Sequence, residues 1–140
     1  MTRADILALI DRRQALSNRH DADALAALHA DTSVVESLMA GTIRGRAAIA
    51  QVSEAFFRAC PDVTHRTDDV LVDGNRVAQF ATVSGTDTGG FMGLPPTGKP
   101  FRLPMVFLYT IEDGLIAHER RIYDFTGLLI QIGVLKAKPV

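Results

Sequence analysis

Three ionisable side chains near the C-terminal end carry the strongest chemical signal. His118, Arg120 and Asp124 lie in a segment rich in β-branched and aromatic residues, which is typical of a strand. A strand alternates its faces with period two, so these three share a face with Ile116 and Ile122. The isoleucines predict that this face points inward, where charged groups need partners or a wet cavity. A ligand pocket with titratable groups and a structural ion-pair cluster both satisfy that requirement.

In the pocket interpretation, Asp124 is the candidate general base. An apolar pocket raises the pKa of a carboxyl group toward neutral pH, where a general base works best. Arg120 would either stabilise the ionised form of that carboxyl group or hold an enolate oxygen, and His118 would relay a proton or bind a ligand carbonyl. The structural alternatives are a helix N-cap for Asp124, because Thr126-Gly127 begin a helical segment, and a partner to a neighbouring carboxylate for His118.

The opposite face of the same strand carries Glu119, Arg121 and Tyr123. By parity, Glu119 and Arg121 point outward, to solvent or to a second copy of the chain. Tyr123 shares that face and is predicted to be structural, unless a β-bulge intervenes and changes the parity.

The first half of the chain predicts three helices and a strand. A helix is expected over 2–17, and Asp21 can cap a second one. A strand over 33–39 follows, and then a loop over 40–42. The third helix starts at Gly45-Arg46 and ends near Ala59, before a proline.

The second half predicts four strands in two hairpins, because an Asp-Gly pair interrupts each of two apolar alternations. The expected strands are 63–72 with 76–85, and 101–111 with 115–125. A loop rich in Gly, Thr and Pro separates the hairpins, and a short helical tail over 127–133 follows. This order indicates an α+β fold, in which a bent, mainly antiparallel sheet wraps around the helices and leaves a pocket.

The third helix and the long strands would supply the pocket walls. Aromatic and methionine side chains at such spacing also occur in plain hydrophobic cores. The candidate substrate-binding residues are Met39, Val52, Phe56, Phe91, Met105 and Phe107.

Composition narrows the classes of function. The 140 residues carry a net charge of −1 without a run of like charges, which argues against nucleic acid or an anionic membrane as partner. No apolar stretch approaches the ~20 residues of a membrane span, so one cytoplasmic domain over 1–140 is expected. The four histidines are scattered, Cys60 is a single cysteine, and the glycine-rich loop lacks a phosphate-binding order. We therefore expect neither metal nor cofactor.

Short motifs in a fixed order extend this interpretation. They are Asn18-Arg19-His20-Asp21, Gly45-Arg46 with Pro61-Asp62, Pro95-Pro96-Thr97-Gly98-Lys99, and Asp124 with Gly127-Leu128-Leu129. In this combination the chain resembles the SnoaL-like polyketide cyclases of the nuclear transport factor 2-like superfamily. The resemblance implies a cone-shaped α+β barrel with three N-terminal helices and an apolar pocket, in a homodimer. It also implies an Asp general base, at Asp124, for an intramolecular aldol ring closure.

The chain lacks the catalytic motifs of two other groups of enzymes in the superfamily. Ketosteroid isomerases carry a base Asp after a Glu, where this chain has Ser37 after Glu36. Limonene epoxide hydrolases use an Arg-x-Asp pair, which the strand beginning Phe101-Arg102 lacks.

The sequence thus favours a cyclase-type enzyme that acts on a small apolar carbonyl compound by general acid–base chemistry. The alternatives are a module that binds a small hydrophobic molecule or dimerises without catalysis, and an epoxide hydrolase or isomerase. A homodimer is expected to form through the outer sheet face, with Glu119, Arg121 and Tyr123 in the contact.

Overall fold

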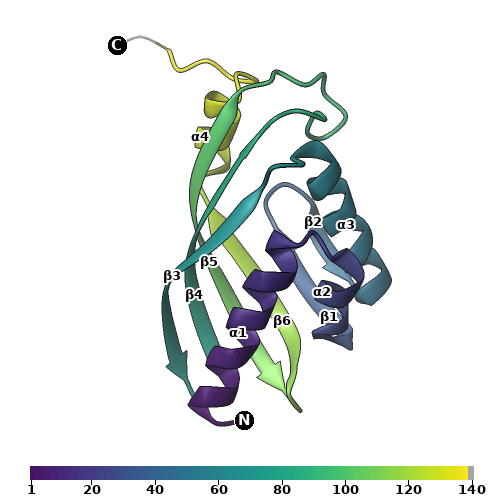
Figure 1. Cartoon of the computed structure of the whole chain (residues 1–140), viewed down its shortest axis with the longest axis vertical. Coiled ribbons are helices and arrows are strands. Elements are labelled where there is room, and N and C mark those ends of the chain that lie inside the picture. The colour runs from purple at the N-terminus through teal and green to yellow at the C-terminus, as the bar shows by residue number, and fades with distance from the viewer. Residues whose placement is uncertain (139–140) are drawn as a thin grey trace.

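The computed structural model describes residues 1–138 and has the predicted α+β architecture. A curved, open six-stranded sheet carries the helices on its concave side, and a short fourth helix lies at the far end (Figure 1). The elements are α1 Arg3–Asn18, α2 Ala22–Ala27, β1 His29–Ser37, β2 Gly41–Arg44, α3 Arg46–Ala59, β3 Thr64–Asp73, β4 Arg76–Thr86, β5 Pro100–Glu112, β6 Leu115–Tyr123 and α4 Phe125–Gln131.

The sheet has the order β2-β1-β6-β5-β4-β3. Every neighbouring pair is antiparallel except β1 and β6, which run parallel. The prediction of a mainly antiparallel sheet is therefore confirmed. The expected loop at residues 40–42 is wrong, because β2 begins at Gly41 and pairs with β1.

Local signals explain where the helices begin. Thr2 and Asp5 form a reciprocal capping box at the start of α1, and Asp21 caps α2 as predicted. Gly45 adopts a φ of 83° before α3, which favours glycine. The next residue, Arg46, donates from its Nε atom to the carbonyl of His29 at 2.7 Å, so this motif joins α3 to β1.

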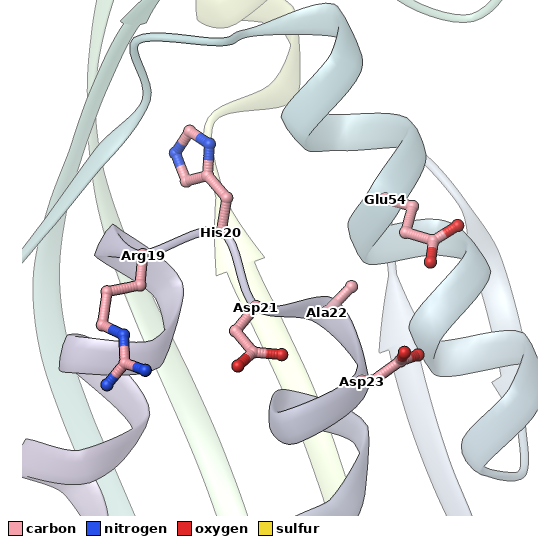
Figure 2. A pocket seen from close by; sticks show the side chains of 6 residues that line it. All are labelled: Arg19, His20, Asp21, Ala22, Asp23 and Glu54. Atoms are coloured by element: carbon pink, nitrogen blue, oxygen red, sulfur yellow. The ribbon is translucent and has the colours of Figure 1, made fainter.

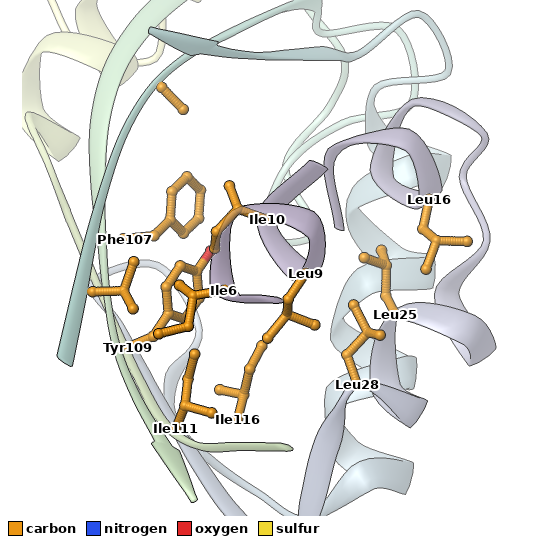
Figure 3. Close-up of a cluster of buried hydrophobic side chains, with 12 residues drawn as sticks. Ile6, Leu9, Ile10, Leu16, Leu25, Leu28, Phe107, Tyr109, Ile111 and Ile116 are labelled. Atoms are coloured by element: carbon orange, nitrogen blue, oxygen red, sulfur yellow. The ribbon is translucent and has the colours of Figure 1, made fainter. Parts of the chain in front are cut away.

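Helix α1 packs an apolar face against the sheet. Figure 3 shows Ile6, Leu9 and Ile10 of α1 facing side chains of the sheet and of α2. The sheet side of this cluster includes Phe107, Tyr109, Ile111 and Ile116. Removal of this apolar surface from water stabilises the packing of α1 against the sheet.

The β5–β6 hairpin has the predicted Asp-Gly turn. Asp113 and Gly114 both have positive φ, at 52° and 76°. Two such residues match a type I′ turn, whose twist suits a two-residue hairpin.

A β-bulge in β6 changes which side chains point inward. Thr110 pairs with His118 and Ile111 pairs with Ile116, so Ala117 is an extra residue without a partner in β5. Ile116 is therefore buried on the concave face, and so is Glu119, three residues later. Beyond Ala117, the inward and outward positions of β6 are therefore exchanged relative to the prediction.

Glu119 joins α1 to β6 through buried charges. Its Oε1 atom lies 3.4 Å from Nη2 of Arg13 on α1, and its Oε2 atom accepts from Nε of Arg121 at 2.6 Å. The Arg13 guanidinium also lies over the Phe107 ring, 4.5 Å from its centroid. Glu119 is completely buried, and its two cationic partners offset the large cost of removing its charge from water.

None of the helices in residues 1–138 is both long and apolar enough to cross a membrane.

The first prediction concerns this buried carboxylate. Glu119→Gln keeps the side-chain shape but leaves Arg13 and Arg121 without a counter-ion. We expect the free energy of unfolding to fall by about 3–5 kcal/mol, because one partner of a buried ionic cluster is lost. Urea denaturation followed by circular dichroism measures the change.

Glu36→Gln is the matched control. Glu36 pairs with His118 at 2.8 Å, but both side chains are about half exposed, so the expected loss is below about 1 kcal/mol. Equal losses in the two variants would show that burial does not strengthen the Glu119 cluster.

Candidate active site

A cavity of about 480 Å³ lies between α3, the concave sheet face and the loop after β4. Ligand sites for small molecules commonly have volumes of this order. Apolar side chains form most of the wall, and a few polar groups interrupt it. The polar or charged side chains are Arg13, Ser17, Ser37, Ser53, Arg58, His65, Arg121 and Tyr123.

The six residues predicted to form the pocket wall all line this cavity. The loop and the β1–β2 turn contribute two of them, α3 contributes two and β5 contributes two. All six line the cavity: Phe91, Met39, Val52, Phe56, Met105 and Phe107. Their contact with a substrate stays a prediction.

The structure does not bring the predicted catalytic trio into the cavity. Asp124 is exposed and caps α4, with its Oδ1 atom accepting from the Gly127 amide at 2.8 Å. Arg120 is exposed on the outer sheet face, and His118 pairs with Glu36 on the surface. The inward orientation predicted for these residues is wrong because the bulge at Ala117 reverses the parity of β6.

The opposite set points inward instead. Arg121 and Tyr123 line the cavity, and Glu119 lies buried behind Arg121. The outward orientation predicted for these three residues is therefore also wrong. A β-bulge is the condition under which the sequence predicts that Tyr123 changes face, and the strand contains that bulge.

Two arginines determine the protonation state of Glu119, the buried carboxyl group behind the cavity wall. Burial alone would raise the pKa of Glu119, but Arg121 and Arg13 outweigh burial and lower that pKa to about 2. Glu119 is therefore ionised at neutral pH. His29 Nε2 lies 3.7 Å from Glu119, yet burial lowers the His29 pKa to about 4, so this histidine is neutral at pH 7.

His65 on β3 is the histidine of the cavity wall. Burial lowers its pKa to about 3, and Arg13 and Arg121 contribute to the shift, so the imidazole is neutral at pH 7. Its Nδ1 atom is buried and has no hydrogen-bond partner among residues 1–138. Unpaired polar atoms are rare in protein interiors, and each calls for an explanation such as a catalytic role.

The backbone of His65 is held firmly. Its amide donates to Asn18 Oδ1 at 2.7 Å, and its carbonyl accepts from Asn18 Nδ2 at 3.0 Å. The ring meets Phe56 edge-on, with centroids 6.5 Å apart. A positioned neutral imidazole beside an apolar cavity can accept a proton from a bound compound.

Tyr123 presents a hydroxyl group to the same cavity. Its oxygen accepts from the Met39 amide at 3.0 Å. Ser37 Oγ lies 3.5 Å from the same oxygen, which is a weak contact. The phenolic proton can be donated either to Ser37 Oγ or to a ligand oxygen.

The loop of residues 87–99 is fastened to the wall of the cavity. Asp87 is buried, and its carboxylate accepts from the Gly90 and Thr97 amides at 3.0 Å each. A Cβ atom at Gly89 would lie 2.2 Å from the Arg58 carbonyl oxygen, so the loop packs directly against the end of α3. Phe91 is consequently held in the core.

Two further features offer less chemistry. Burial raises the pKa of the Cys60 thiol to about 12, so the cysteine is unreactive at neutral pH. A second hollow is lined by Arg19, His20, Asp21, Ala22, Asp23 and Glu54. Figure 2 shows these side chains spread around its rim, and Asp21 already serves as the α2 cap. No cluster of three or more potential metal ligands occurs within residues 1–138.

Sequence reasoning missed His65, Arg13, Arg121 and Tyr123 as pocket residues. The available signal for His65 was its place within the alternation of β3. That signal is weak, because β3 is an edge strand with polar residues on both faces. Nothing local in the sequence pairs Arg13 with Glu119, which lies 106 residues away.

Comparison with known proteins agrees with this architecture. A nogalonic acid methyl ester cyclase from Streptomyces nogalater is 32% identical over 108 residues, which cover 76% of this chain and 80% of that protein. TsrD from Streptomyces laurentii is 25% identical, with a TM-score of 0.86 over 96% of this chain and 99% of its own. IdmH from Streptomyces antibioticus is 29% identical, with a TM-score of 0.76 over 90% and 96%.

A family model covers nearly the whole fold. It describes the SnoaL-like polyketide cyclases and matches residues 8–132, from α1 to the end of α4. The chain therefore belongs to the SnoaL-like polyketide cyclase family.

Proposed function

We propose that this protein closes a carbon ring in a mid-sized apolar carbonyl compound by cofactor-independent proton transfer, with His65 as the proton acceptor. The observation that carries this proposal is the neutral imidazole in the cavity wall. Its Nδ1 atom is buried without a partner among the described residues, so the Nε2 atom is the ring nitrogen that a ligand in the cavity can reach. Membership of the cyclase family and the activity of the Streptomyces nogalater relative support the reaction class.

The reaction begins at a carbon beside a carbonyl group. His65 takes a proton from this carbon, and the electron pair of the C–H bond moves into an enolate. The enolate carbon then attacks a second carbonyl carbon of the same molecule, and a C–C bond forms. The new alkoxide regains the proton from the imidazolium, so His65 returns to its neutral state and no other reactant is consumed.

Three side chains of the cavity wall would stabilise the enolate. The Tyr123 hydroxyl can donate to its oxygen, while Arg121 and Arg13 provide positive potential. These arginines oppose the charging of His65 in the free protein. A developing enolate beside the ring supplies a compensating negative charge, so proton transfer becomes favourable only with the ligand in place.

Asp124, His118 and Arg120 are not part of this mechanism. No carboxylate lines the cavity within residues 1–138, so the epoxide hydrolase and isomerase alternatives gain no geometric support. Binding of a small molecule without catalysis remains the competing function, and kinetics of variants separate the two.

The second prediction tests the base. His65→Gln should lower kcat by about 10²–10⁴-fold, the usual contribution of a positioned acid–base group, with little change in substrate affinity. Turnover of nogalonic acid methyl ester, the substrate of the relative, and of related polyketides that carry a free carboxyl group supplies the assay, and absorbance measures it. Because the His65 pKa is about 3, kcat/KM should show no histidine limb between pH 5 and 8.

Two controls accompany this test. His118→Gln removes a surface histidine and should keep the wild-type rate. Asp124→Asn should also keep the rate and the fold, because asparagine caps a helix as well as aspartate does. A wild-type rate for His65→Gln would favour the binding function, and a rate lost only in Asp124→Asn would restore the aspartate as base.

We also propose a homodimer that forms through the outer sheet face, with different contact residues from those that the sequence predicted. Phe80 pairs with Val106, and Val106 pairs with Ile122, which places three apolar residues in one row across β4, β5 and β6. Phe80 and Ile122 are 37% and 42% exposed on either side of Val106, so the row presents apolar surface on the outer face.

The third prediction tests this face. Ile122→Lys should convert a dimer to a monomer at micromolar concentration, because a charge would enter the apolar row. Leu71→Lys, on the edge strand β3, is the control and should leave the dimer intact. Size-exclusion chromatography with light scattering gives the masses, and a monomeric wild-type protein would contradict the proposal.

A further inference from the structure

We infer that the compound held in the cavity carries an ionised carboxylate, which pairs with Arg121 and Arg13. The inference rests on the proposed function for the reaction that follows binding, and it specifies the class of substrate: a free acid of an apolar carbonyl compound, rather than its ester.

The first step is the charge of the inner wall. Arg13 and Arg121 each carry one positive charge, and both contact the single carboxylate of Glu119. Their sum is one uncompensated positive charge. Protonation of His29 or His65 would only add to it. Asp87 does not compensate, because its carboxylate is bonded within the loop and does not line the cavity.

The second step concerns unused hydrogen-bond donors. Arg121 donates to Glu119 through Nε alone, and its two Nη groups have no acceptor among residues 1–138. Arg13 makes one long contact, at 3.4 Å, through Nη2. Within residues 1–138, His65 Nδ1 is the only fully buried side-chain nitrogen or oxygen without a hydrogen-bond partner. The guanidinium nitrogens that lack a partner are therefore not fully buried, and they keep accessible surface. Both arginines line the cavity, which gives a ligand access to these donors.

The third step is the cost of filling the cavity. An apolar ligand expels water from a space lined largely by Phe, Met, Leu and Val side chains. A neutral ligand would therefore leave the excess positive charge without either water or a counter-ion, which is costly. A carboxylate replaces the lost water with charge-assisted hydrogen bonds, and the planar guanidinium can engage both of its oxygens. The cavity consequently discriminates by charge.

The fourth step places this anchor relative to the reaction. Arg121 lies opposite Phe107 on β5, Tyr123 opposite Met105, and His65 on β3 opposite Val83, which pairs with Leu103. Inward residues two apart along β5 therefore order the wall as arginine, tyrosine and histidine. A carboxylate on Arg121 would direct the rest of an elongated ligand along Tyr123 toward His65.

The fourth prediction tests the charge preference with a defined pair of probes. 2-Naphthoate and methyl 2-naphthoate have the same ring system and differ in charge. The chain has no tryptophan, so naphthyl fluorescence can be followed directly. At pH 7.5 the acid should bind at least about tenfold more tightly than the ester. Equal binding, tighter binding of the ester, or no binding of either probe would overturn the inference.

Variants locate the preference. Arg121→Gln should bring the ratio of the two affinities close to one, mainly by weakening the acid. Arg121→Lys keeps the charge without the planar fork and should retain part of the preference. Arg120→Gln removes the adjacent cation from the outer face and should keep the full ratio. Thermal melts confirm that each variant is folded.

These outcomes separate the inference from the proposed reaction. An acid preference that survives Arg121→Gln, or that disappears in Arg120→Gln, overturns the inference. An acid preference that depends on Arg121, together with turnover that does not depend on His65, leaves the inference standing while the proposed reaction fails.

Discussion

A single buried carboxylate, shared by two arginines, is the interaction on which this molecule depends. Glu119 would be costly to bury alone, and Arg13 and Arg121 would be costly beside an apolar cavity without it. Together they fix α1 against β6 and place two guanidinium groups in the cavity wall. The same contacts thus serve the packing of the fold and the electrostatics of the site.

The bulge at Ala117 is what makes this arrangement possible. Without it, a β6 strand with Ile116 buried would also bury His118 and Arg120, and Glu119 would face solvent. One extra residue moves Glu119, Arg121 and Tyr123 to the concave side. It leaves Ile122 on the outer face, in register with Val106 and Phe80. The cavity and the apolar outer row therefore have a common structural origin.

The sequence predicts most of the fold, because its signals are local. Caps at Thr2 and Asp21, the Gly45 junction and the Asp113-Gly114 turn lie within a few residues of the elements they define. The wall residues of α3 and β5 follow from regular periodicity. The site chemistry does not, since the bulge leaves no clear mark in composition. The Arg13–Glu119 contact and the parallel pairing of β1 with β6 depend on the folded chain.

The arrangement of charge suits the proposed proton transfer, in a cavity that no carboxylate within residues 1–138 lines. A carboxylate beside Arg13 and Arg121 would pair with them, as Glu119 does, and would cancel their positive potential. A neutral imidazole does not neutralise the arginines, so their potential remains available to an anionic ligand. Because Glu119 and the Phe107 ring already hold the arginines in place, little reorganisation is needed when that negative charge arrives.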